Sequence, residues 1–186
     1  MNSAQHLLVM MSIILGFGIR ELLSGGRAMV ADRPRREFRI LPLLAGALIL
    51  VAIVQFWWYL FIVANRGVWG GNFFVFAATL LRPGLLFLSA ASVFPPPGSH
   101  HDPVPYYFRN RAFIYLPLAV FEVQNLVESA LNLGTLRHPA HLFHGVFIAV
   151  GIVLAISARE TVHKVFLPLL LALVAIFIAS FSLQIE

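Results

Sequence analysis

Two oppositely charged residues stand in the middle of apolar segments of this 186-residue chain. Arg82 lies within the apolar segment 73–94, and Glu122 lies within the segment 112–133. A charge alone at that depth in a membrane costs several kcal/mol, so it pairs with another charge or faces water. If both segments are antiparallel helices rising about 1.5 Å per residue, the two side chains reach the same level. We therefore expect an Arg82–Glu122 ion pair, as a structural link, a gate or a binding site.

The residues after Arg82 predict an interruption of its helix. Pro83 lacks the N–H that a helical hydrogen bond needs, and Gly84 loosens the following turn. The segment 73–94 is therefore expected to be kinked or broken at mid-depth. An interrupted helix beside a charge is a feature of transport sites in membrane proteins.

Further polar residues fall on the same side of these segments. Asn125 and Glu128 share one helical stripe of the segment 112–133. Gln55, in an earlier apolar segment, falls at a similar depth to Glu128. This spacing predicts a polar cavity that opens toward the outer side of the membrane.

Two histidines could serve as metal ligands. His141 and His144 are three residues apart and so share a helix face. With Glu128 or His138 they could hold a divalent metal ion. Their position near the start of a helix favours the simpler interpretation that they are interfacial.

The composition defines the class of protein. Hydrophobic residues make up 60% of the chain and charged residues only 11%, against about 25% in a typical soluble domain. Mean hydropathy is +0.87. This composition indicates an integral membrane protein. The absence of cysteine excludes disulfides, iron–sulfur clusters and thiolate nucleophiles, and the sequence carries no recognisable catalytic motif. We predict neither an enzyme nor a bound cofactor.

The apolar segments predict an all-α, single-domain bundle of six transmembrane helices, because a span needs about 20 residues. The predicted spans are 4–25, 40–64, 73–94, 112–133, 141–158 and 165–183. Most basic residues lie in the loops 26–39, 95–111 and 159–164. The positive-inside rule places these loops in the cytoplasm and both termini on the outer side. This distribution explains the basic residues without nucleic acid as a partner.

Similar features recur at the two ends of the chain. The pairs Arg20-Glu21 and Arg159-Glu160 each follow a stretch of apolar and small residues at the predicted inner edge. We expect inner-edge ion pairs there, with the arginines reaching lipid headgroups. Spans 1–2 and 5–6 are therefore predicted to be two copies of one helical hairpin. A Leu-Pro-Leu tripeptide begins the second, fourth and sixth spans.

The first two spans carry strings that resemble a known group of proteins. These strings are Ile14–Gly18, Leu22–Gly25 and Val54–Trp58. They resemble a group of small, uncharacterised bacterial multi-pass membrane proteins. The resemblance implies a six-helix protein of the bacterial inner membrane and implies no activity.

Three functions remain open from the sequence. The first is a small channel or transporter for an ion or small solute, with a break at Pro83 and a path lined by Arg82, Glu122, Glu128, Asn125 and Gln55. The second is a non-catalytic accessory or assembly subunit of a larger membrane complex. The third is a metal-dependent membrane enzyme. The expected partners are the lipid bilayer and either further copies of this chain or a membrane complex.

Overall fold

The computed structural model describes residues 3–31, 40–65, 73–96, 98–99, 101–135 and 137–182. Within these residues all regular structure is helical, which confirms the all-α prediction. The elements are α1 (Ser3–Ala31), α2 (Ile40–Asn65), α3 (Phe73–Val93), α4 (Pro103–Leu133), α5 (Pro139–Ile156), α6 (Glu160–Phe177) and the π-helical turn η1 (Ile178–Ser182).

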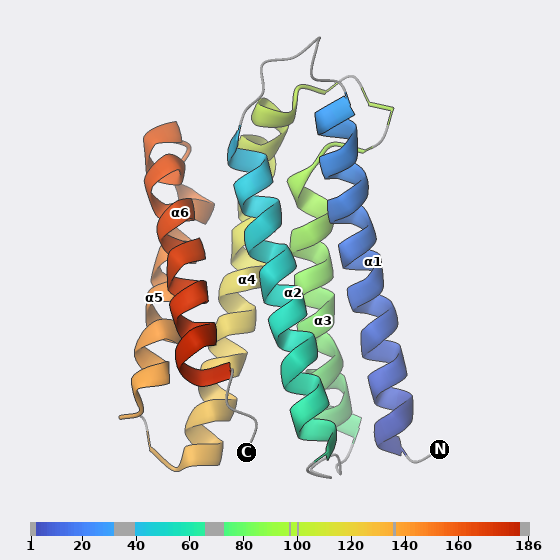
Figure 1. Ribbon diagram of the computed structural model, residues 1–186, viewed down its shortest axis with the longest axis vertical. Helices are drawn as coiled ribbons and strands as arrows, with labels where there is room; N and C mark the ends of the chain where they lie inside the picture. Colours follow the sequence, from blue (N-terminus) through green and yellow to red (C-terminus); the bar gives the residue numbers. More distant parts are fainter. Residues whose placement is uncertain are drawn as a thin grey trace.

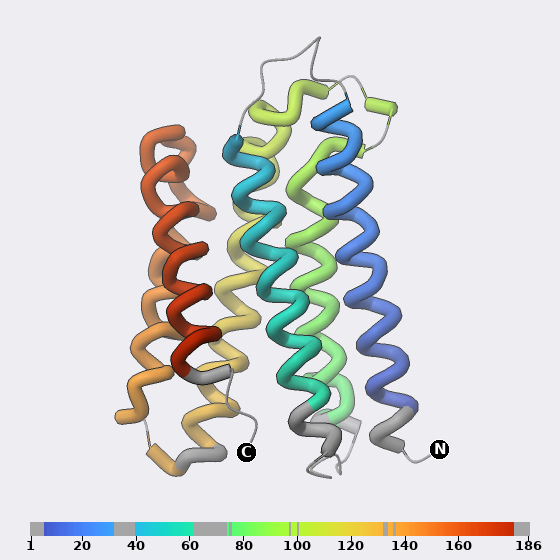
Figure 2. Tube along the Cα trace, viewed as in Figure 1, coloured from blue at the N-terminus to red at the C-terminus, as the bar shows by residue number. Residues whose placement is uncertain are grey.

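Successive helices run in opposite directions along one bundle axis (Figure 1). The helix α4 packs against both α3 and α5, α1 packs against α2 and α3, and α6 packs against α2 and α5. The tube in Figure 2 shows that α1 begins and α6 ends at the same end of the bundle. The helix α4 therefore joins the group α1–α3 to the hairpin α5–α6.

Five helices are long and apolar enough to cross a membrane, namely α1, α2, α3, α5 and α6. This finding agrees with an integral multi-pass membrane protein. The helix α4 has the length to cross, but it is more polar because it carries Glu122, Gln124, Asn125 and Glu128. A sixth span, the orientation of the termini and the repeated hairpin stay predictions.

Several helices extend beyond the predicted spans. The helix α4 begins at Pro103, inside the predicted loop 95–111, because the carboxylate of Asp102 accepts a hydrogen bond from the Val104 amide at 3.1 Å. The helix α1 continues to Ala31, and α6 begins at Glu160. The loop predicted at 159–164 is therefore mostly helical. Residues 32–39, 97 and 100 of the other predicted loops lie outside the described residues.

Close contacts between helices hold the α1–α3 group together. Gly25 of α1 lies directly against the Phe94 side chain, so that a Cβ atom added at Gly25 would overlap with it. At Gly46 of α2, an added Cβ would lie 3.1 Å from two ring carbons of Phe94. The outer surface carries large exposed apolar side chains such as Phe17 and Ile156, as lipid contact requires.

Candidate functional site

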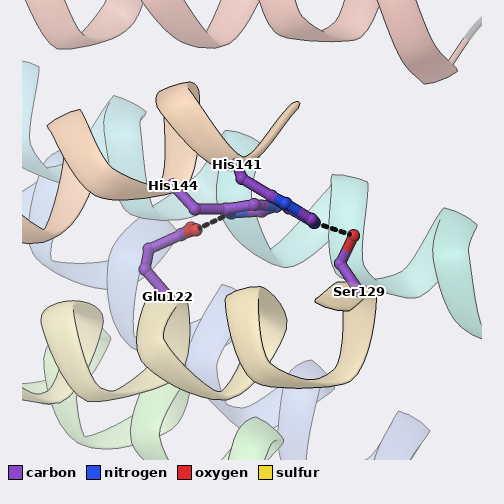
Figure 3. Close-up of polar contacts among 4 residues, drawn as sticks. All are labelled: Glu122, Ser129, His141 and His144. Atoms are coloured by element: carbon purple, nitrogen blue, oxygen red, sulfur yellow. Dashed lines mark hydrogen bonds and ion pairs between the residues drawn. The ribbon is translucent and has the colours of Figure 1, made fainter. Parts of the chain in front are cut away.

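A carboxylate and a histidine join α4 to α5 in the interior of the bundle. The Nδ1 atom of His144 lies 2.6 Å from Oε2 of Glu122 (Figure 3). The two side chains are 12% and 19% exposed, respectively. Each helix thus supplies one member of a largely buried polar pair, which offsets much of the cost of placing Glu122 there.

A second polar contact joins the same helices, about one turn away on α5 and two turns away on α4. Oγ of Ser129 lies 2.9 Å from Nε2 of His141, and Figure 3 shows both histidines pointing from α5 toward α4. The other ring nitrogen of His141 is buried without a hydrogen-bond partner among the described residues. His141 and His144 therefore bind different groups of α4, although they share a helix face.

Arg82 forms its ion pair with Glu128, and the predicted Arg82–Glu122 pair is wrong. The side chain of Arg82 is largely buried, and that of Glu128 is about one-third exposed. The sequence prediction measured the depth of Glu122 from the start of the predicted span at residue 112. The helix α4 begins nine residues earlier, at Pro103. Glu122 and Glu128 are six residues apart, or about 9 Å along a helix. A shift of about six residues in the estimated depth of α4 therefore places Glu128, and not Glu122, at the level of Arg82.

The predicted break at Pro83 is also absent, while a kink there stays a prediction. The helix α3 is continuous from Phe73 to Val93, with Pro83 inside it. Transmembrane helices tolerate proline because neighbouring groups satisfy the freed backbone atoms. Pro83 therefore lies beside the Arg82–Glu128 pair without interrupting the helix.

A cavity of about 400 Å³ lies between α2, α4, α5 and α6. Its wall is mainly apolar and aromatic, and its polar groups come chiefly from one side of α4. These polar lining residues are Gln55, Tyr59, Tyr115, Glu122, Asn125, Glu128, Ser129 and His144. The structure thus brings together Gln55, Glu122, Asn125 and Glu128, as the sequence predicted. Arg82 reaches this group through Glu128.

The predicted inner-edge pairs have different outcomes. Arg20 lies 3.5 Å from Glu21, with both side chains well exposed, so this pair contributes little stability. Glu160 pairs with Lys164 at 3.1 Å, so the predicted Arg159–Glu160 pair is wrong. Lys164 lies four residues after Glu160 on the same face of α6, whereas Arg159 precedes the first turn of this helix.

A second buried polar cluster was not predicted. The Tyr107 hydroxyl lies 2.6 Å from that of Tyr115 and 2.5 Å from Nδ1 of His163. Nε2 of His163 lies 2.9 Å from the carbonyl oxygen of Ser157. A carbonyl only accepts, so for a neutral imidazole Nε2 donates to Ser157 and Nδ1 accepts from Tyr107. Tyr107 in turn accepts from Tyr115.

This cluster connects the start of α4 with the start of α6. Burial raises the pKa of the Tyr107 hydroxyl well above its ordinary value, so it stays protonated and can donate. The only signal in the sequence was that Tyr107, Tyr115 and His163 all fall near the same predicted membrane edge. Their partners are up to 56 residues apart, and periodicity within one helix carries no information about them.

The candidate metal ligands do not form a metal-binding group among the described residues. Among the described residues, no group of three or more histidine, aspartate or glutamate side chains is placed to hold a metal ion. His144 binds Glu122 and His141 binds Ser129, while Glu128 binds Arg82.

No protein-family model, curated protein or solved structure matches this chain.

Proposed function

We propose that this chain is a small multi-pass membrane transporter that binds a small solute in the cavity between α2, α4, α5 and α6. The observation that carries the proposal is that Glu122, Asn125 and Glu128 of α4 all line this cavity. Burying two carboxylates is costly, and ionisable residues within membrane-spanning helices commonly mark the path of a substrate or ion. Here both carboxylates border an internal space that a solute can occupy.

The size and composition of the cavity support solute binding. Ligand cavities typically measure about 300–1,000 Å³ and combine apolar walls with a few placed polar groups. The cavity of about 400 Å³ has this character, with the polar groups concentrated on α4. A cavity of limited volume favours a carrier over a channel, because a channel requires a continuous pore.

The arrangement of the helices supports a route for movement. The residues that line the cavity come from the hairpin α5–α6 and from α2 and α4. Figure 1 shows the hairpin beside these two helices. Rocking of one group of helices against another opens many carriers alternately to each side of the membrane. We propose that the hairpin α5–α6 is the moving unit.

The proposal includes six spans, with α4 as the sixth, in the bacterial inner membrane and with both termini outside. The proposed orientation is supported by basic residues that gather at one end of the bundle. Arg109 and Arg111 lie near the start of α4, and Arg159 and Lys164 lie at the start of α6, which Figure 1 places at the same end. Cytoplasmic ends of membrane helices are enriched in such residues.

Filling the cavity tests this function. We expect Ala52→Trp, at a cavity-lining position of α2, to abolish uptake into proteoliposomes. Ala149→Trp, at an exposed position of α5, makes the same change outside the cavity and should leave uptake intact. The probes are radiolabelled tetraethylammonium, phenylacetate and glucose, one for each class of charge.

Uptake of at least one probe above that of empty vesicles, lost only in Ala52→Trp, supports a transporter. No uptake of any probe, or equal uptake by both variants, contradicts it. Absence of uptake together with a stoichiometric membrane partner on purification would instead favour an accessory subunit.

A further inference from the structure

The positive and negative charges of the residues in and beside the cavity do not balance. Arg82 neutralises Glu128 through their ion pair, and Arg82 itself does not line the cavity. Glu122 has His144 as its hydrogen-bond partner, and a neutral imidazole adds no charge. With His144 counted as neutral, the formal charges of Arg82, Glu128 and Glu122 sum to one negative charge, which Glu122 carries. An occupant with one positive charge would compensate it.

Much of the cavity wall is aromatic. The rings that line the cavity are Phe56, Trp58, Tyr59, Tyr115, Phe121, Phe147 and Phe177. Aromatic faces attract ammonium groups, most strongly where water is excluded. Hard metal ions instead require several oxygen ligands, and the described residues gather no metal-binding group. Rings together with one carboxylate that no arginine neutralises therefore suit an organic cation better than an inorganic one.

We propose that the cavity accepts a monovalent organic ammonium ion, held between the Glu122 carboxylate and the aromatic wall. This inference rests on the proposed function and names its substrate class. A volume of about 400 Å³ holds an ammonium group that carries an aromatic or branched substituent. His144 acts as a positioning residue, because its hydrogen bond fixes the carboxylate at the cavity wall.

The test compares molecules of the same shape and different charge on the full chain in nanodiscs. The probe is benzyltrimethylammonium, and the control ligand is neopentylbenzene, in which carbon replaces the charged nitrogen. Benzenesulfonate supplies the anion. We expect the cation to bind at least tenfold more tightly than either of the other two.

Variants locate the binding. Glu122→Gln keeps a hydrogen-bond acceptor for His144 and removes the charge, so we expect cation binding to weaken at least tenfold. The matched control is Glu160→Gln, an exposed carboxylate at the start of α6, which should change nothing. Phe147→Leu removes one ring of the wall and should also weaken cation binding, which keeps the proposal testable if Glu122→Gln does not fold.

Equal or tighter binding of neopentylbenzene or benzenesulfonate in the cavity would overturn the cation inference and leave a solute carrier in place. Failure of all three ligands to bind would also overturn it. The uptake experiment with Ala52→Trp then decides separately whether the chain is a transporter.

Discussion

His144 of α5 and Glu122 of α4 form a hydrogen bond of 2.6 Å across the interior of the bundle, and both side chains line the cavity. The contact links the hairpin α5–α6 to the helix that supplies most of the polar wall. A movement of α5 relative to α4 would change the hydrogen bond that positions the Glu122 carboxylate. Binding at Glu122 and movement of the hairpin are therefore coupled in the proposed carrier.

The pairing of Arg82 with Glu128 predicts which second substitution restores stability. Arg82→Met removes one partner and leaves Glu128 unpaired. We expect the free energy of unfolding in mixed detergent micelles to fall by about 1–2 kcal/mol, less than for a fully buried pair because Glu128 is partly exposed. Adding Glu128→Gln should restore most of the loss. Recovery through Glu122→Gln instead would show that Glu122 is the partner of Arg82.

The sequence predicted which polar residues meet, because helical periodicity is local. Asn125 and Glu128 lie on one stripe of α4, Gln55 was matched to Glu128 by depth, and all three line the cavity. It could not predict which carboxylate pairs with Arg82, because that depends on where α4 begins. Asp102 starts the helix at Pro103, outside the apolar segment that marked the span. The contact between His144 and Glu122 likewise depends on how two helices pack.

Removal of the Tyr107 hydroxyl should be costly. Tyr107→Phe leaves the hydroxyl of Tyr115 and Nδ1 of His163 buried without partners. We expect a loss of about 1–3 kcal/mol in the free energy of unfolding. Tyr106→Phe removes the same atom from the adjacent, half-buried residue and should cost less than about 0.5 kcal/mol. Equal effects of the two variants would contradict the hydrogen-bonded chain.

The same residue predicts a dependence of stability on alkaline pH. The pKa of Tyr107 is raised in the folded state by burial, whereas in the unfolded chain it is about 10. The contribution of the protonated Tyr107 hydroxyl to the free energy of unfolding is therefore complete below pH 10 and is lost as the pH rises above that value. Above pH 10 the wild-type chain should lose up to about 1.4 kcal/mol per pH unit more than Tyr107→Phe. Unfolding curves of the two proteins with the same slope against pH would refute this assignment.

Two glycines of α1 should respond differently to the same substitution. A Cβ at Gly25 overlaps with Phe94, while a Cβ at Gly16 meets nothing within 4 Å. Gly25→Ala should lower the free energy of unfolding by about 1–3 kcal/mol through overpacking. Gly16→Ala should leave it unchanged or raise it by up to about 1 kcal/mol, since alanine favours the helix. A similar response at both sites would show that α1 does not pack on Phe94 through Gly25.

Asn125 borders the cavity, and in the proposed transporter solutes reach this cavity from water. The chain has no cysteine, so the reactivity of a single introduced cysteine measures this access directly. Single cysteines at Asn125, and at the exposed apolar residue Val127 on another face of α4, are treated with charged methanethiosulfonate reagents in proteoliposomes. We predict that Asn125→Cys reacts, faster with the cationic reagent than with the anionic one, and that Val127→Cys does not react. An Asn125→Cys variant as inert as Val127→Cys would contradict the proposed transport cavity.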